Sequence, residues 1–175
     1  AGLSVLQDGG NSVEACVAVA ATLAVVYPHM TGIGGDGFWL VREPDDSVYS
    51  INACGAAGEN VSTALYRDQQ LEAIPWRGPL AAITPAGTIS GWQAALARSG
   101  STLPLSRLLR DAVHYARAGV SVTKGGAEVA ASKDAELRDV PGYSDVFHPG
   151  GVPLKEGQLL KQPALARTLK RLIHE

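Results

Sequence analysis

The chain has 175 residues, of which 46% are hydrophobic and 18% are charged, and its formal net charge at pH 7 is -2. This length fits one domain with a real hydrophobic core and is short for two, so we treat residues 1–175 as a single domain. With a pI near 6.1, the chain lacks the basic excess of nucleic-acid-binding proteins, and we expect no nucleic acid partner.

The chain opens directly into a helical pattern, without an initiator Met or a leader. We interpret it as a fragment or a processed piece of a longer protein, which leaves the compartment open between cytoplasm and periplasm. No membrane partner is expected, because the apolar run 13–26 contains Glu14 and Thr22 and is shorter than the roughly 20 residues that a bilayer requires. Cys16 and Cys54 make no disulfide framework, and Cys16, inside the apolar run, is expected to be buried.

Two helices are predicted before the first proline. The first is short, carries Leu3 and Leu6 on one face and ends at Gly9 and Gly10. Asn11 then has the position of an N-cap, and Glu14 three residues later completes a capping box. The second helix, which ends before Pro28, is rich in alanine and apolar nearly all round. We therefore expect it to be buried on several sides, at the centre of a layered fold.

Four glycines follow this helix in "YPHMTGIGGDGFWLV", residues 27–41. A phosphate-binding loop would follow a strand and open a helix, whereas here a helix comes first and a strand follows. No lysine follows the glycines, and Asp36 would repel a phosphate. We interpret the loop as a tight chain reversal with positive φ at several glycines, a geometry that is also compatible with close approach of the backbone to a substrate.

A β-hairpin is predicted next, with strands at 38–43 and 47–53 joined through Pro-Asp-Asp. Residues 55–91 are rich in Gly, Pro and Ala and indicate an irregular connection with one short helix near 62–66. Three more helices are predicted. They cover 104–119, 126–139 and 162–175, with apolar stripes of Leu105, Leu108, Leu109, Ala112, Val113 and Ala116 on the first and Leu165, Leu169 and Leu172 on the last. Strands and helices without regular alternation favour an α+β fold.

The residues that most often carry chemistry form no recognisable site. The four histidines have no metal-ligand spacing, so no metal is expected, and His114 is expected to be partly buried in its helix. Trp76 and Trp92 lie in segments predicted to be irregular, where covering the core is favoured over lining a pocket. No cofactor motif is present either.

Four stretches together resemble the large subunit of the γ-glutamyltransferase family. They are "GLSVLQDGGNSVEACVAVAATLAVVYPHMTGIGGDGFWLV", "ITPAGTISGW", "LPLSRLLRDAVHYARAGVSVT" and "GVPLKEGQLLKQPALARTLKRL". They are similar to the family's "GGNAVDAAVA" helix, its "GGGGF" strand entry and its "TPGTVAGF" segment, in the same order and over essentially the whole chain. The resemblance implies an N-terminal-nucleophile hydrolase, whose αββα sandwich of two sheets between helical layers is completed by a small subunit cut from the same precursor.

The resemblance also implies that the nucleophile is the N-terminal Thr of that small subunit, so we expect no catalytic residue in this chain and no activity of the fragment alone. The full enzyme would cleave or transfer an amide-linked acyl group, either γ-glutamyl or that of a small amide such as oxamate. The glycine loop would be a scaffold element close to the active site. Unpaired strand edges and apolar surface predict a homo-oligomer if the fragment is isolated. The alternative is a catalytically silent binding or interaction domain that keeps the family fold.

One departure from the family pattern concerns the substrate. Members that act on γ-glutamyl groups carry a "D-F-R-E-M-A-P"-like segment whose Arg binds the substrate α-carboxylate. The corresponding "SINACGAAGE" has Cys54 at that position and Gly55 beside it, so we expect an amide other than γ-glutamyl, such as oxamate or a cephalosporin-type substrate. The predicted substrate-binding residues are Cys54 and Asn52. For Cys54, filling a strand end and lining a pocket are weighed equally, and a reactive thiol is disfavoured because no neighbouring His or Lys lowers its pKa.

Overall fold

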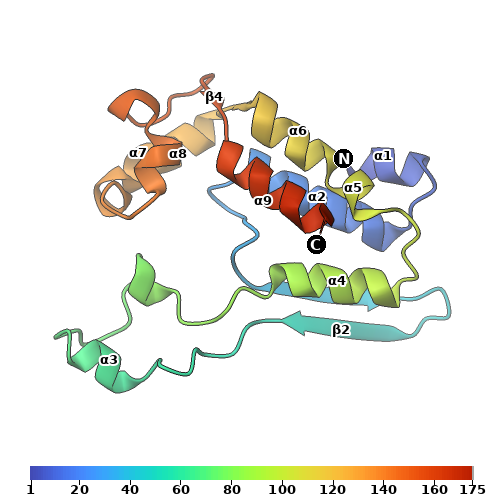
Figure 1. Ribbon diagram of the computed structural model, residues 1–175, viewed down its shortest axis with the longest axis horizontal. Helices are drawn as coiled ribbons and strands as arrows, with labels where there is room; N and C mark the ends of the chain where they lie inside the picture. Colours follow the sequence, from blue (N-terminus) through green and yellow to red (C-terminus); the bar gives the residue numbers. More distant parts are fainter. Residues whose placement is uncertain (175) are drawn as a thin grey trace.

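The computed structural model describes residues 1–174, and the α+β prediction is confirmed (Figure 1). The helices are α1 (Gly2–Gln7), α2 (Ser12–Val26), α3 (Thr63–Arg67), α4 (Thr88–Arg98), α5 (Leu105–Leu108), α6 (Arg110–Ala118), α7 (Lys124–Leu137), α8 (Tyr143–Phe147) and α9 (Pro163–His174). The strands are β1 (Gly37–Arg42), β2 (Val48–Ala53), β3 (Val120–Ser121) and β4 (Leu159–Leu160). Among the described helices, none combines the length and apolar character needed to cross a membrane.

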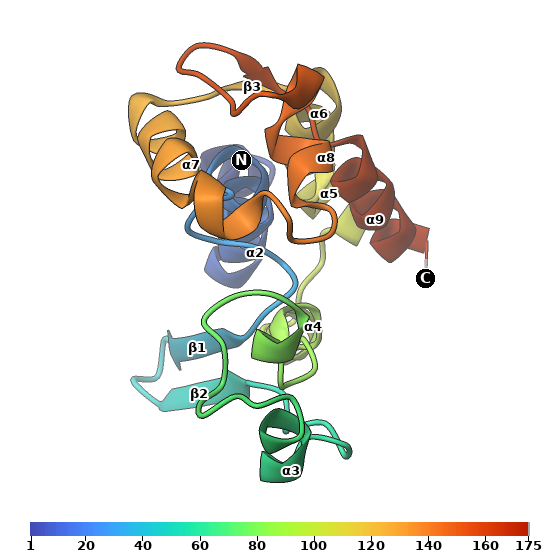
Figure 2. The same ribbon diagram turned by 90° about the vertical axis from the view of Figure 1, so that its left-hand side faces the viewer.

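The hydrophobic core forms around α2, which packs against α1 and α6, while α9 also packs against α6 (Figures 1 and 2). The predicted apolar stripes of 104–119 and 162–175 face this core, although the first is divided into α5 and α6. Small side chains on α2 let the neighbouring helices approach closely, because Ala18 and Ala21 are only 1% and 0% exposed. The central position predicted for α2 is therefore confirmed.

One face of α2 nevertheless stays open, and the burial predicted for Cys16 is wrong. Cys16 is exposed, and Val19 and Leu23, which share its face, are 40% and 41% exposed. On α1, Leu3 and Leu6 point to solvent at 71% and 49% exposure, because α1 docks through a neighbouring stripe that includes Gly2. A Cβ at Gly2 would lie 2.7 Å from Val19 Cγ2, so the small residue allows this close docking.

The predicted hairpin is confirmed as an antiparallel pair of β1 and β2, with Gly37 opposite Ala53 and Arg42 opposite Val48. Its inner face, which includes Trp39, packs against α4 (Figure 1). Its outer face carries Phe38 and Leu40, which are 71% and 79% exposed. The alternation of inner and outer residues follows the two-residue period of a strand.

Helix α4 lies where an irregular connection is predicted, and that prediction is wrong for residues 88–91. Its N-terminus has no side-chain cap, and Gly91 interrupts its sequence, so the usual helix signals are weak. Gly91 is needed for packing, since a Cβ there would lie 2.6 Å from Ala53 Cβ. Trp92 is buried on α4 as expected, whereas Trp76 is 94% exposed, because it lies in the connection between α3 and α4 and has no core to cover.

The other elements agree with the sequence in outline. The short helix predicted near 62–66 is α3, and the helix predicted at 126–139 is α7, shifted by two residues. Gly119 ends α6 with a φ of 96°, as its position after the apolar stripe indicates. His114 is exposed rather than partly buried, because it lies on the side of α6 opposite the buried Ala112 and Ala116.

Glu14 ties the start of α2 to the connection between α4 and α5. The predicted capping box is present, because Glu14 N donates to Asn11 Oδ1 at 2.9 Å and Asn11 N donates to Glu14 Oε2 at 2.6 Å. The other carboxylate oxygen, Oε1, accepts from Ser101 Oγ at 2.7 Å, Thr102 N at 2.8 Å and Leu103 N at 2.7 Å. Glu14 is 0% exposed, so these hydrogen bonds compensate its carboxylate for the hydration that is lost on burial.

This arrangement predicts a loss of stability in acid. Burial on its own would raise the pKa of Glu14, but the four hydrogen bonds that its carboxylate accepts outweigh burial and lower the pKa from its usual 4.5. A lowered pKa in the folded state means that the stabilisation is complete above the unfolded-state pKa and is lost as the pH falls through the folded-state value. We expect the urea midpoint of the chain to fall between pH 6 and pH 3, and this fall to be smaller in Glu14→Gln; an equal fall in both proteins would contradict the assignment.

Candidate functional site

The candidate site lies where the glycine loop, the end of β2 and the start of α4 meet (Figure 1). The Gly35 carbonyl oxygen accepts from Gly87 N at 3.0 Å and from Thr88 N at 2.9 Å. Thr88 Oγ1 lies 2.8 Å from the same oxygen and 3.0 Å from the Asp36 carbonyl oxygen. Since Thr88 is only 7% exposed, the start of α4 holds the loop from the inside of the molecule.

Two glycines let the backbones at this junction touch. A Cβ at Gly55 would lie 1.9 Å from Pro85 O, and a Cβ at Gly87 would lie 2.0 Å from Ala53 O. Neither distance is possible for a real side chain, so the chain after β2 and the chain before α4 pack directly against each other. This contact sets the direction in which the residues at the end of β2 leave the sheet.

The strand-end cluster, as we call Asp36, Asn52 and Cys54, projects from this junction. Cys54 N donates to Asn52 Oδ1 at 3.1 Å, Cys54 Sγ lies 3.4 Å from Asp36 Oδ2, and Gly55 N lies 3.4 Å from Asp36 Oδ1. All three side chains of the cluster are exposed. The structure therefore brings together both residues predicted to bind substrate.

The sequence alone does not predict a substrate-binding role for Asp36. In the sequence, this residue only argues against phosphate binding by the glycine loop. The hairpin register could have identified it, because pairing of Gly37 with Ala53 sets the preceding residue, Asp36, beside the following residue, Cys54. The effect on Cys54 is clear. Its hydrogen bond to Asp36, together with slight desolvation and the negative charge of Asp36, raises the pKa of the thiol. A raised pKa disfavours the thiolate, which is the nucleophilic form of cysteine.

The interpretation of the glycine loop as a chain reversal with positive φ is wrong. Each glycine in the described chain with positive φ lies outside residues 31–37. Gly32, Gly34 and Gly35 have open space where a Cβ would be, while a Cβ at Gly37 would lie 3.4 Å from Thr88 Cα. The turn is held by hydrogen bonds from the start of α4 instead. The groups that define the site are a carboxylate and an amide, in contrast to the row of N–H donors of a phosphate loop.

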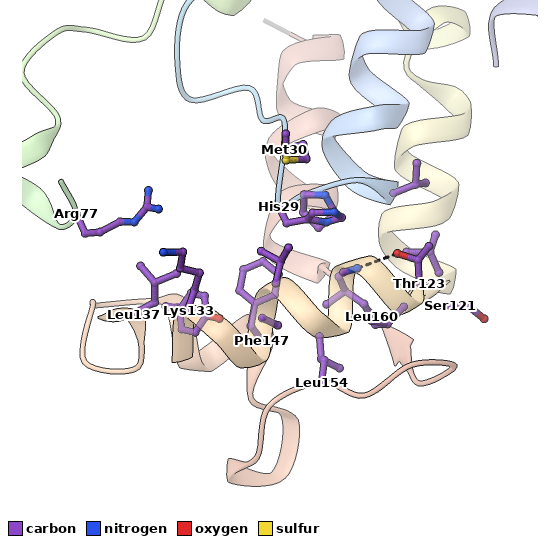
Figure 3. Close-up of a pocket in the computed structure, with 18 residues that line it drawn as sticks. His29, Met30, Arg77, Ser121, Thr123, Lys133, Leu137, Phe147, Leu154 and Leu160 are labelled. Atoms are coloured by element: carbon purple, nitrogen blue, oxygen red, sulfur yellow. Dashed lines mark hydrogen bonds between the residues drawn. The ribbon is translucent and has the colours of Figure 1, made fainter. Parts of the chain in front are cut away.

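A separate cavity of about 470 Å³ lies between the end of α2, the segment that follows it, and α7 and α8 (Figure 3). His29 and Met30 face the side chains of α7 and α8 across it. Its wall is mainly apolar, with Leu137, Phe147, Leu154 and Leu160 among the lining residues. The two cations at its edge, Arg77 and Lys133, both pair with Glu136, at 3.6 and 2.8 Å. No residue of the strand-end cluster lines this cavity.

Comparison with known proteins identifies relatives over the whole chain. A model of the gamma-glutamyltranspeptidase family matches residues 1–175. The chain is 48% identical over 174 residues to the oxamate amidohydrolase proenzyme of Klebsiella pneumoniae, a match of 97% of this chain and 33% of that protein. It is 38% identical over 170 residues to the glutathione hydrolase-like YwrD proenzyme of Bacillus subtilis, a match of 97% of this chain and 32% of that protein. The chain thus spans about a third of the length of these curated relatives.

Solved structures agree with this grouping. The γ-glutamyltranspeptidase of Helicobacter pylori superposes with a TM-score of 0.91 at 28% identity, over 99% of this chain and 50% of that chain. A cephalosporin acylase from Bacillus halodurans superposes with a TM-score of 0.89 at 26% identity, over 99% of this chain and 33% of that chain. The predicted fold class, part of an N-terminal-nucleophile hydrolase sandwich, is confirmed by these structures. Because the family model covers both the glycine loop and the hairpin that build the strand-end cluster, as well as the helices behind them, the chain belongs to the γ-glutamyltranspeptidase family.

Proposed function

We propose that residues 1–175 are part of the large subunit of an amide-cleaving enzyme that prefers a small amide, such as oxamate, to a γ-glutamyl compound. The observation that carries this proposal is the contact between Cys54 and Asp36. An enzyme that selects a γ-glutamyl group needs a cation for its α-carboxylate, ideally an arginine that binds with two hydrogen bonds. Here a neutral thiol occupies the expected position, and a carboxylate lies 3.4 Å from it.

The nucleophile in this proposal is the N-terminal threonine of a small subunit made in the same precursor. A hydroxyl is a weak nucleophile until a base takes its proton, and the residue's own α-amino group, with a usual pKa of about 7.7–8.0, can do so near neutral pH. The hydroxyl oxygen then attacks the amide carbonyl, the amine leaves with a proton, and water releases the acyl group from its ester. Residues of the present chain position the acyl group, and the chemistry requires no cofactor.

Two exposed apolar faces support the proposal that a further subunit covers this chain. One is the outer face of the hairpin, with Phe38 and Leu40, and the other is the open face of α2, with Val19 and Leu23. In a layered fold, each sheet or helix face of this kind is buried against another layer. If residues 1–175 were isolated, the same faces and the hairpin edges would favour association of copies with one another.

Turnover by the intact, processed enzyme tests the proposed function. We expect kcat/KM for oxamate to exceed that for γ-glutamyl-p-nitroanilide, because losing a charge-assisted carboxylate contact costs about 2–5 kcal/mol of binding, or roughly 30-fold to several thousandfold. We expect residues 1–175 alone to turn over neither compound. A precursor whose nucleophilic threonine is replaced by alanine serves as the inactive control. Clear preference for the γ-glutamyl compound, or hydrolysis by the fragment alone, would refute the proposal.

A further inference from the structure

The Asp36 carboxylate retains unused hydrogen-bonding capacity at the candidate site. Each of its oxygens has one contact, to Cys54 Sγ and to Gly55 N, and both contacts are long at 3.4 Å. A carboxylate can accept about four hydrogen bonds, so at least half of its capacity faces solvent. Within residues 1–174, no cation lies at ion-pair distance from it.

The backbone on both sides of Asp36 is held in place. The carbonyl oxygen of Gly35, the preceding residue, accepts hydrogen bonds from the start of α4, and the following residue, Gly37, is paired with Ala53 in the hairpin. Because the backbone that carries Asp36 is fixed in this way, the segment loses little freedom when a ligand binds, which favours selective recognition. Beside it, Gly34 and Gly35 leave open space where side chains would otherwise stand.

Asn52 supplies the opposite kind of group. Its Oδ1 accepts from Cys54 N at 3.1 Å, which orients the amide so that Nδ2 is the free end. Nδ2 has no hydrogen-bond partner among residues 1–174, and the side chain is exposed. Together the cluster therefore offers an acceptor on Asp36 and a donor on Asn52, both anchored to Cys54. A primary carboxamide, which has an NH₂ donor and a C=O acceptor, is the complementary group.

We propose that Asp36 and Asn52 are specificity-determining residues that accept an acyl substrate with a carboxamide at this position and reject one with a carboxylate there. This inference rests on the proposed amide-cleaving function and specifies its substrate class. The acyl group of oxamate is compatible with it, because its carboxylate is bonded directly to the scissile carbonyl carbon. The α-carboxylate of a γ-glutamyl group lies three carbons further out and meets the negative charge of Asp36 instead.

Two isosteric anilides test the inference on the intact, processed enzyme. Glutaryl-p-nitroanilide ends in a carboxylate, and 4-carbamoylbutanoyl-p-nitroanilide carries a carboxamide at the same distance from the scissile bond. We expect kcat/KM to favour the carboxamide by at least about tenfold, since a like charge at this distance is unfavourable and an amide gains a hydrogen bond. Asp36→Asn should remove this preference, mainly through KM, because an asparagine accepts and donates equally well.

Asp68→Asn is the matched control, because it makes the same change in net charge at an exposed position at the end of α3. We expect it to leave the preference unchanged. Asn52→Asp provides a second variant, since its carboxylate can still accept from Cys54 N but no longer donates to a substrate carbonyl; we expect it to lower kcat/KM for the carboxamide by about tenfold. If Asp36→Asn lowers the Tm of the enzyme, the Asn52→Asp variant tests the inference in its place.

The outcomes separate this inference from the proposed function. An enzyme that cleaves either anilide with a preference unaffected by both variants overturns the inference and leaves the amide-cleaving function intact. Cleavage of oxamate with neither anilide accepted overturns it as well, because a distal carboxamide would then have no site. Failure to cleave any of these amides, including γ-glutamyl-p-nitroanilide, overturns the proposed function itself.

Discussion

Replacement of Glu14 by alanine is expected to lower the free energy of unfolding by about 3–5 kcal/mol, because it leaves several buried donors without a partner at once. Asn11 N at the start of α2 and the donors of residues 101–103 all depend on this one carboxylate. Glu14 is 0% exposed, so these donors are also shielded from bulk solvent. Urea unfolding followed by circular dichroism would measure the loss.

An intermediate variant and a control variant accompany this measurement. Glu14→Gln keeps an acceptor oxygen but puts an NH₂ donor opposite other donors, so an intermediate loss of about 1–3 kcal/mol is expected. Glu128→Ala is the matched control, because Glu128 is an exposed glutamate on α7 whose ion pair with Lys124 is 3.9 Å long. Its removal should change stability by less than about 1 kcal/mol. An equal loss of unfolding free energy in Glu14→Ala and Glu128→Ala would show that the buried hydrogen bonds of Glu14 stabilise the fold no more than an exposed ion pair does.

The second large effect is expected at Gly87. Gly87→Ala would place a Cβ 2.0 Å from Ala53 O, and because that oxygen belongs to the backbone of β2, no side-chain rotation relieves the clash. Either α4 or the hairpin must shift, and we expect a loss of about 3 kcal/mol or more, at the upper end of overpacking effects. In the intact enzyme the same shift would displace Cys54, so activity should fall together with stability.

The control for this variant is Gly125→Ala on α7. Gly125 is exposed, its φ is not positive, and nothing lies within 4 Å of a Cβ built there. Alanine in a helix is favoured over glycine by up to about 1 kcal/mol, so this variant should be neutral or slightly more stable. Thermal unfolding of the two variants side by side would check both signs, and a Gly87→Ala protein as stable as the parent would contradict the close approach.

Local patterns in the sequence predicted the elements that carry strong signals. The capping box at Asn11 and Glu14, the hairpin and the apolar stripe of α6 are all defined by residues within a few positions of one another. Helix α4 carries weaker signals, since it has no side-chain cap and contains Gly91, and what stabilises it is packing of that glycine against β2. Such packing depends on residues far apart in the chain, which a local pattern does not encode.

The candidate site shows the same difference between features that a local sequence pattern predicts and features that depend on residues far apart in the chain. Cys54 and Asn52 could be selected because the family resemblance marks the segment at the end of β2. Asp36 could not, because its importance comes from the register that sets it beside Cys54 and from the absence of a nearby cation among the described residues. The burial predicted for Cys16 is wrong for a related reason, because an apolar helix face is buried only where a neighbouring layer is present to cover it.

The contacts of Glu14 also have a consequence for the order in which the chain matures. Its partners at 101 to 103 are 87 to 89 positions away, so α2 leaves the ribosome long before they do. At the rate of protein synthesis, roughly 5–20 residues per second, that delay is several seconds. Until then Oε1 of Glu14 lacks its protein donors and keeps its water, so the helical core cannot close over the first turn of the central helix. Nascent chains shorter than this point should therefore remain open to proteases at their amino-terminal end.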